Sequence, residues 1–241
     1  MSTKPLQPTY EPYDESTQTA WRIKGYDRSF TRTPDAAKIA RPLTLTELTG
    51  PQGLDRRFEV DTADLSRLSP TAPRAFGQLM LMQGQILDQD NAPVAGAVVE
   101  MWQANASGKY IHEYDQADAP VDPNFIGSGR FVTDAEGRFS FTTIKPGAYP
   151  VPDSGKWWRP PHIHFSIFGD SWMSRLVTQM FFPGDPLNAH DRLLNSVADP
   201  AARERLIARA VPTTEGPENA LVFRHTMVLR GHAETPALDE A

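Results

Sequence analysis

Two histidines one residue apart are the side chains of this sequence best placed to do chemistry. His162 and His164 directly follow an Arg-Pro-Pro sequence, and the residues from 163 to 168 are mostly β-branched or aromatic. The prolines fix their own φ and disfavour helix before them, so the segment is predicted to run on as a β-strand. Alternate side chains of a strand share a face, which places the two imidazoles side by side. This spacing suits a metal site, but it also suits two polar residues on a solvated sheet face.

Two tyrosines are the strongest candidates for further ligands. Zinc normally takes Cys, His or carboxylate ligands, and the chain has no cysteine. Tyr110 closes a Gly-Lys-Tyr sequence, and Tyr149 lies in the loop before the histidines. Tyr114 is equally close to the first loop and could replace Tyr110, while Tyr149 beside Pro150 could simply pack on the sheet. A tyrosine becomes an anionic ligand only when a hard, highly charged cation displaces its proton, and Fe³⁺ does this most readily. Two phenolates and one hydroxide would neutralise that ion in a buried site.

The other histidines form no comparable pattern. His112 and His190 lie in polar loops, and His232 lies in the C-terminal tail. His225 lies in a predicted strand without a second histidine two residues away, so we interpret it as a structural residue whose hydrogen bonds are satisfied.

Composition narrows the class of protein. The chain has 241 residues, a net charge of −6 and 39% hydrophobic residues, which indicates a globular protein able to bury a core. No basic stripe suggests nucleic-acid binding. The lack of cysteine excludes a disulfide framework, a Cys-based metal site and a Cys nucleophile. No signal peptide or membrane-spanning run is visible, so a cytoplasmic location is expected.

The segments that must position these side chains are mostly strands. From residue 76 onward, apolar or alternating runs are separated by turn clusters of Gly, Pro, Asp and Asn, which is typical of an all-β fold, an antiparallel β-sandwich. One short helix late in the chain is predicted at 201–210, after Asp199-Pro200, because this segment is rich in helix formers. Strands are predicted at residues 78–87, 97–102, 137–143, 162–168, 176–182 and 221–229.

The first third of the chain has a different character. Residues 1 to about 75 are rich in proline and have few periodic stretches; a short helix at 44–48 is predicted there. A long irregular segment often wraps a partner subunit, although it can also cover its own domain. The chain is therefore expected to consist of an irregular N-terminal arm at 1–75, in contact with another subunit, and a β-sandwich domain at 76–241.

Beyond these local patterns, the sequence resembles the intradiol ring-cleavage dioxygenases over residues 76 to about 230. The segment 81–110 resembles the signature of that family, and two later stretches resemble its remaining iron ligands and its active-site arginine. The family order Tyr, Tyr, Arg, His, His is complete. The positions that carry the resemblance are Gly84, Gly96, Glu100, Gly108, Tyr110, Pro146, Gly147, Tyr149, Arg159, Pro160, Pro161, His162 and His164.

The resemblance implies a catalytic non-haem Fe³⁺ centre. Its ligands would be Tyr110, Tyr149, His162 and His164, with hydroxide as a fifth. Tyr149 would leave the metal as substrate binds and act as a base. Arg159 would stabilise negative charge on the substrate.

The resemblance also implies roles for residues around the metal. Gln179 would hydrogen-bond near the oxygen site. Trp102 and Tyr26 would line the substrate pocket, with Tyr26 contacting a substrate carboxylate. Val151 stands where some relatives are expected to have tryptophan, which changes the expected shape of the pocket.

The implied reaction inserts both atoms of O₂ into protocatechuate and cleaves its ring to 3-carboxy-cis,cis-muconate, as part of aromatic catabolism through the β-ketoadipate pathway. The same chemistry on catechol or hydroxyquinol is the first alternative. Those enzymes carry a helical N-terminal dimerisation segment, whereas residues 1–73 here are proline-rich and mostly non-helical. The second alternative is a non-catalytic, transthyretin-like β-sandwich binding module. The implied partner is a homologous α chain that lacks the iron ligands, in a higher α–β oligomer.

Overall fold

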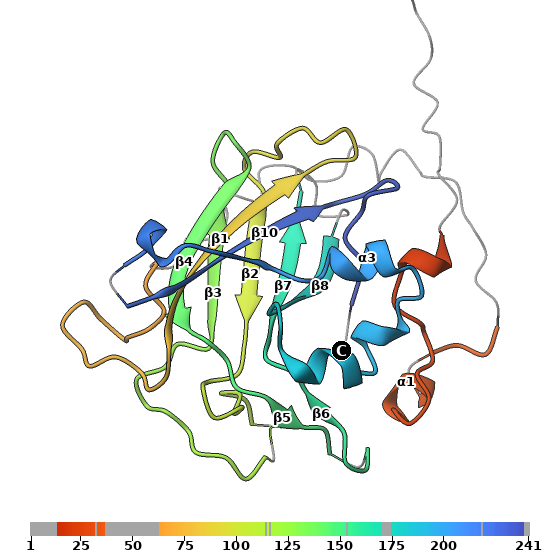
Figure 1. Cartoon of the computed structure of the whole chain (residues 1–241), viewed down its shortest axis with the longest axis horizontal. Coiled ribbons are helices and arrows are strands. Elements are labelled where there is room, and N and C mark those ends of the chain that lie inside the picture. The colour runs from red at the N-terminus through yellow and green to blue at the C-terminus, as the bar shows by residue number, and fades with distance from the viewer. Residues whose placement is uncertain are drawn as a thin grey trace, which may run out of the picture.

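The chain folds as a β-sandwich of two four-stranded sheets, with a small two-stranded sheet at one end (Figure 1). The structure is a computed structural model and describes residues 14–31, 33–36, 63–113, 115, 117–152, 154–169, 175–217 and 219–238. The prediction of an all-β sandwich is confirmed. In the described ranges, no helix has the length and apolar character needed to cross a membrane. The predicted helix at 44–48 lies outside these ranges.

The first sheet has the order β4 (Arg138–Ile144), β1 (Leu79–Leu87), β10 (Leu221–Val228) and β9 (Arg209–Val211). β1 is antiparallel to β4 but parallel to β10. The sandwich is therefore mixed at this one pair, whereas the sequence had predicted an antiparallel sandwich. The difference arises because the chain passes through the second sheet before β10 returns beside β1, and strand patterns carry no information on that pairing.

The second sheet has the order β3 (Ser128–Val132), β2 (Val98–Trp102), β7 (His162–Phe168) and β8 (Arg175–Phe181), and all its pairs are antiparallel. The remaining strands, β5 (Tyr149–Pro150) and β6 (Trp158–Arg159), pair with each other. Six predicted strands are confirmed as β1, β2, β4, β7, β8 and β10. In the described ranges, four strands were not predicted: β9, the two-residue β5 and β6, and β3, which contains a glycine and is too short to show a clear period.

The hydrophobic core lies between the two sheets. Side chains of β7 that alternate with the histidines, Ile163, Phe165 and Ile167, are fully buried in it. They meet Met80 and Met82 of β1 from the opposite sheet. His162 and His164 consequently face away from the core, toward the side covered by loops.

The predicted helix at 201–210 is only half right. α3 (Pro200–Glu204) begins where expected, with the Asp199 side chain accepting a hydrogen bond from the N–H of Ala201. The chain then leaves the helix, and Arg209–Val211 becomes β9. The edge of β10 offers unpaired backbone groups to this segment, and pairing with that edge outweighs the helix propensity of its residues.

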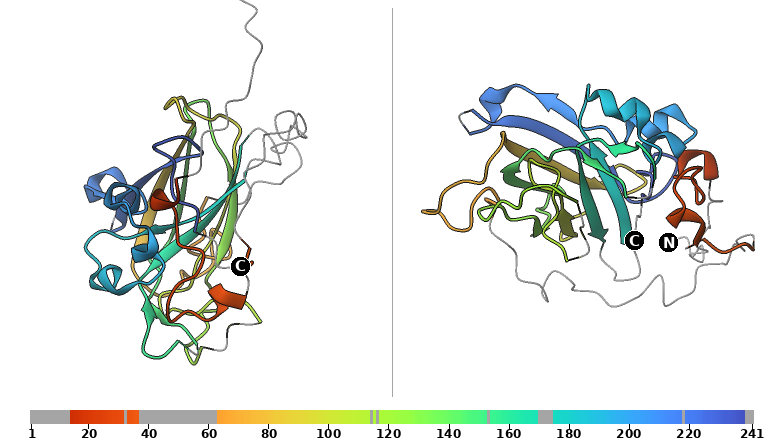
Figure 2. Two further views of the ribbon diagram at one scale, coloured as in Figure 1. Left: turned by 90° about the vertical axis from the view of Figure 1, so that its right-hand side faces the viewer. Right: turned by 90° about the horizontal axis from the view of Figure 1, so that it is seen from below.

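The described part of the N-terminal arm packs on its own chain. It contains the 3₁₀ turn η1 (Glu15–Thr17), which lies beside α3, and the short helix α1 (Arg28–Thr31) (Figure 2). Ile23 and Tyr26 enter a second hydrophobic cluster with Leu193 and Leu194. Leu65 lies in the main core, although it precedes the predicted domain boundary at residue 75. The division at residue 75 and the contact of the arm with another subunit stay predictions.

Candidate metal centre

Strand register places three of the candidate side chains in one row. Trp102 of β2 lies opposite His164 of β7, and His164 lies opposite Gln179 of β8. Directly paired residues of neighbouring strands project to the same face of a sheet. The Trp102 ring stacks on the His164 ring, with 4.8 Å between centroids and 11° between planes. This row forms the floor of the site on the outer face of the second sheet.

Two loops carry the tyrosines over this floor, and two glycines let them approach. A Cβ on Gly108, which has φ of +78°, would lie 2.2 Å from the carbonyl oxygen of Ala148. A Cβ on Gly147 would lie 2.3 Å from the carbonyl oxygen of Ala106. The backbones of the loops therefore touch just before Tyr110 and beside Tyr149, and only glycine permits such contact.

The four predicted ligands converge. The phenol oxygen of Tyr110 lies 3.0 Å from Nε2 of His164 and 3.5 Å from Nε2 of His162. The phenol oxygen of Tyr149 lies 3.3 Å from Nε2 of His162, and the two Nε2 atoms are 3.2 Å apart. Tyr114, the alternative to Tyr110, lies outside the described residues. Ligand atoms held about 2 Å from one ion are themselves roughly 3 Å apart, so this spacing suits a shared metal.

Both imidazoles are held in the neutral form, and a hydrogen bond fixes which nitrogen of His162 carries the proton. Nδ1 of His162 lies 2.7 Å from the carbonyl oxygen of Pro160, which can only accept, so Nδ1 carries the proton and Nε2 is bare. Burial, followed by the charge of Arg159, holds the pKa of His162 well below its usual range and that of His164 at about 3. Neutral imidazole is the form that binds metals.

The tyrosines determine which metal fits. Burial raises the pKa of Tyr110 well above its usual value, and the nearby Tyr149 raises it further, so a phenolate here requires a cation. Among the described residues, no three His, Asp or Glu side chains cluster as a metal site, so the donor set depends on the tyrosines. Two phenols and two neutral imidazoles fit a hard trivalent ion, and the residues present thus fit ferric iron.

Arg159 enters the site as a buried cation. The whole residue is 1% exposed, and its strand β6 pairs it directly with Tyr149 of β5. Nε donates to Oδ2 of Asp191 at 2.6 Å, and Nη2 donates to Oε1 of Gln179 at 2.6 Å. Burial opposes the charge, but Asp191 and then Tyr149 raise the pKa of Arg159 above its usual value. No sequence pattern indicated Asp191, because a lone aspartate in a polar loop has no local pattern.

Two residues predicted for the pocket lie farther from the tyrosines. The Tyr26 ring meets the Trp157 ring edge-on at 5.3 Å, and Trp157 lies 5.8 Å from the guanidinium of Arg159. Val151, half-buried, packs on the same hydrophobic cluster as Tyr26. Tyr26 therefore reaches the arginine side of the site through Trp157, and its contact with substrate stays a prediction.

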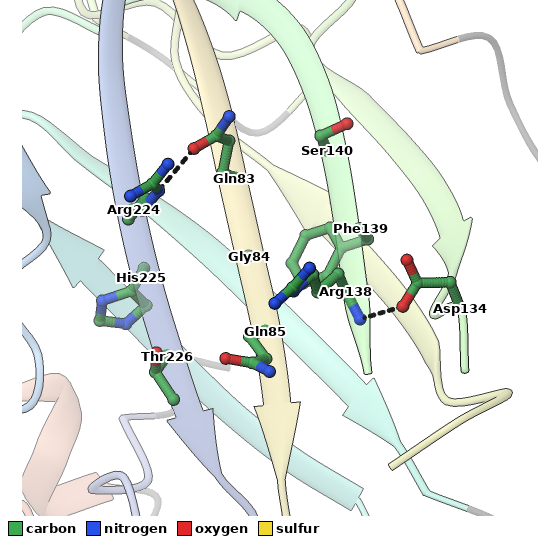
Figure 3. A pocket seen from close by; sticks show the side chains of 10 residues that line it. All are labelled: Gln83, Gly84, Gln85, Asp134, Arg138, Phe139, Ser140, Arg224, His225 and Thr226. Atoms are coloured by element: carbon green, nitrogen blue, oxygen red, sulfur yellow. Dashed lines mark hydrogen bonds between the residues drawn. The ribbon is translucent and has the colours of Figure 1, made fainter. Parts of the chain in front are cut away.

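His225 lies on the other sheet and does not match its predicted description. It is buried opposite Gly84, and its Nε2 has no hydrogen-bond partner among the described residues, so it is not a satisfied histidine. It borders a pocket on the first sheet (Figure 3). Amide and guanidinium groups dominate this pocket, including the hydrogen bond from Arg224 to Gln83.

Comparisons with known proteins find a matching family and several relatives of this chain. A family model described as "Dioxygenase" matches residues 50–231. The chain is 50% identical over 173 residues to the protocatechuate 3,4-dioxygenase beta chain of Burkholderia cepacia, a match that covers 72% of this chain and 73% of the relative. It is 39% identical over 121 residues to the hydroxyquinol 1,2-dioxygenase of Rhizobium sp. (strain MTP-10005), covering 46% of this chain and 39% of the relative.

A solved structure with a similar fold is the 3-chlorocatechol 1,2-dioxygenase of Rhodococcus opacus 1CP. It superposes with a TM-score of 0.53 at 23% identity, covering 71% of this chain and 68% of that one. At this identity the likeness supports the fold.

Proposed function

Because the chain belongs to the intradiol ring-cleavage dioxygenase family, we propose that it is the iron-bearing β chain of a protocatechuate 3,4-dioxygenase. The observation that carries the proposal is the convergence of the phenol oxygens of two half-buried tyrosines on two buried imidazole nitrogens, at 3.0–3.5 Å. Tyr110, Tyr149, His162 and His164 would hold Fe³⁺. The ion would act as a Lewis acid that lowers the pKa values of the two substrate hydroxyls and orients the ring toward O₂.

The protein supplies bases and fixed charge. The phenolate oxygen of Tyr149 would accept a hydroxyl proton of the catechol. The Arg159 guanidinium, buried beside it, stabilises negative charge that develops on the ring during attack. Nε2 of Gln179 is buried and has no partner among the described residues, so this amide N–H is available to an oxygen atom in the site. Trp102 fixes the plane of His164 by stacking.

Protocatechuate is favoured over related catechols by the relative that is 50% identical over most of both chains. Catechol and hydroxyquinol are the alternative substrates, and a hydroxyquinol enzyme is also a relative, over a smaller part of the chain. Oxygen uptake with each compound separates them. We expect the highest kcat/KM with protocatechuate; equal or better turnover of plain catechol would overturn the substrate assignment.

The metal is tested by the visible spectrum of the purified protein. We expect a tyrosinate-to-iron charge-transfer band, which shifts without bleaching when protocatechuate is added under anaerobic conditions. A colourless protein after expression with ample iron would favour the alternative of a non-catalytic β-sandwich binding module.

The partner is part of the same proposal. The Burkholderia relative is named a beta chain, which supports a homologous α chain without iron ligands as the partner of this chain. We assign the contact to the N-terminal arm, residues 1–75. Removing residues 1–13 from the co-expressed complex should weaken its assembly, measured by size-exclusion chromatography. An unchanged complex would show that residues 1–13 are not needed for the contact.

A further inference from the structure

We propose that Asp191 is a positioning residue that fixes the Arg159 guanidinium over the reaction site. The proposal rests on the function proposed above and deepens it. The pair is the most buried ion pair in the described part of the chain, with side chains 2% and 0% exposed. An arginine with no counter-ion at this depth would be strongly destabilising, so the pair acts as a unit.

The Asp191 carboxylate is anchored on both oxygens. Oδ2 accepts from Nε of Arg159 at 2.6 Å, and Oδ1 accepts from the N–H of Leu194 at 2.7 Å, where η4 (Leu194–Ser196) begins. The Asp191 carbonyl also accepts from the N–H and the side-chain amide of Asn195. The carboxylate cannot turn toward or away from the arginine without breaking one of these bonds.

The anchor itself is rigid. Leu193 and Leu194, which follow Asp191 in the chain, are 1% and 2% exposed and lie in the second hydrophobic cluster. The guanidinium of Arg192 donates to the carbonyl of Gly25 from the N-terminal arm. The loop that carries Asp191 is thus held by apolar packing and by the arm, independently of the tyrosine loops.

This anchoring determines the orientation of Arg159. A guanidinium is planar, so holding Nε by Asp191 and Nη2 by Gln179 at 2.6 Å each fixes its plane. The β5–β6 pairing fixes the backbone end of the side chain beside Tyr149. A cation that stabilises charge in a transition state must already be oriented, because reorientation during the reaction would cancel much of the gain. Asp191 supplies that orientation without touching the substrate.

The test is a double-mutant cycle on the assembled enzyme. We expect Asp191→Asn to lower kcat for protocatechuate by roughly 10- to 100-fold with KM and iron content little changed, as for other residues that orient a catalytic group. The same substitution made in an Arg159→Ala background should cost almost nothing further, because Asp191 acts through Arg159. Crystals of Asp191→Asn should show the guanidinium turned away from Gln179.

Asp122→Asn is the matched control. Asp122 is a buried aspartate whose oxygens accept from the backbone N–H groups of Phe76 and Asn124, and no salt bridge to an arginine is found for it among the described residues. It should lower the melting temperature and leave kcat unchanged. If Asp191→Asn does not assemble, Asp191→Glu keeps the charge and shifts the carboxylate by one methylene, and it should lose kcat while keeping iron.

Two outcomes overturn the inference: wild-type kcat in the Asp191 variants, or full additivity with Arg159→Ala. Failure of the proposed function has a different signature, since the wild-type complex would then lack the iron band or consume no O₂ with protocatechuate. The guanidinium orientation in crystals of the variant is a readout that does not depend on activity.

Discussion

The histidines on the two sheets share burial but differ in their neighbours. Burial lowers the pKa of His225 to about 4 and that of His164 to about 3, so all three buried histidines, His162 included, are held neutral. His162 and His164 face the loops on the outer side of their sheet, where Tyr110 and Tyr149 reach them. His225 lies on the same face of β10 as Phe223 and Met227 of the core, and no tyrosine is among the described residues that line the pocket beside it. A neutral, buried histidine is therefore not sufficient for a metal site. The two regions differ because loops bring the tyrosine oxygens to His162 and His164 but not to His225.

The largest expected effect comes from removing a histidine from the metal site and comparing it with the same change at the buried histidine of the other sheet. His162→Ala removes one of four donors, and we expect loss of bound iron, of the visible band and of oxygen uptake. His225→Ala is the matched substitution in the other sheet, and it should keep the band while lowering stability by about 2 kcal/mol or more through the cavity it leaves. Iron analysis and the absorption spectrum of both variants test whether His162, but not His225, is needed for iron binding. Full iron occupancy in His162→Ala would remove it from the ligand set.

Tyr149→Phe tests the oxygen donors that distinguish the two regions. Iron should stay bound, as expected for a ligand that leaves the metal when substrate binds, but one base and one negative charge are lost. We expect kcat to fall roughly 10²- to 10⁴-fold, the range for general bases, with slower formation of the substrate complex in stopped-flow absorption. Unchanged activity would contradict the role of Tyr149 as the base.

Lowering the pH should reduce the free energy of unfolding through protonation of His225, which is not a metal ligand. The unfolded chain takes up a proton near pH 6.5, whereas folded His225 takes it up only near pH 4. Its stabilising contribution is complete above pH 6.5 and falls as the pH is lowered toward 4, by about 1.4 kcal/mol per pH unit and roughly 3 kcal/mol in total. Urea unfolding of the wild type and His225→Leu from pH 7 to 4 measures this. The difference between the two curves isolates His225, and parallel curves would refute its depressed pKa.

The smallest expected effect concerns the floor of the site. Trp102→Phe keeps an aromatic ring opposite His164 but reduces the stacked area, at a cost of about 1 kcal/mol. Iron should stay bound, with a modest rise in its dissociation constant in competition with a chelator. A matched Phe131→Leu substitution removes a stacked ring in the core, 5.0 Å from Phe141, and should change stability without changing iron affinity.

Local patterns predicted much of the fold. Six strands, the H-x-H pair on one face of β7, and the family order of tyrosines, arginine and histidines are all visible in the printed sequence, because period-two alternation and short motifs are local. The late helix was predicted beyond its true end, since pairing with the edge of β10 is a long-range interaction. The parallel pairing of β1 with β10 was missed for the same reason.

The sequence by itself determined that the chain is a β-sandwich of this family and which side chains are suited to a ferric site. Tertiary structure alone decided that Tyr110 and Tyr149 meet the histidines, through loop backbones that touch at Gly108 and Gly147. It also decided that Asp191 pairs with Arg159 and that His225 lies on the other sheet, away from the tyrosines. Spacing along a strand fixes which residues share a face, but distances between loops depend on how distant segments pack, and no local pattern encodes them.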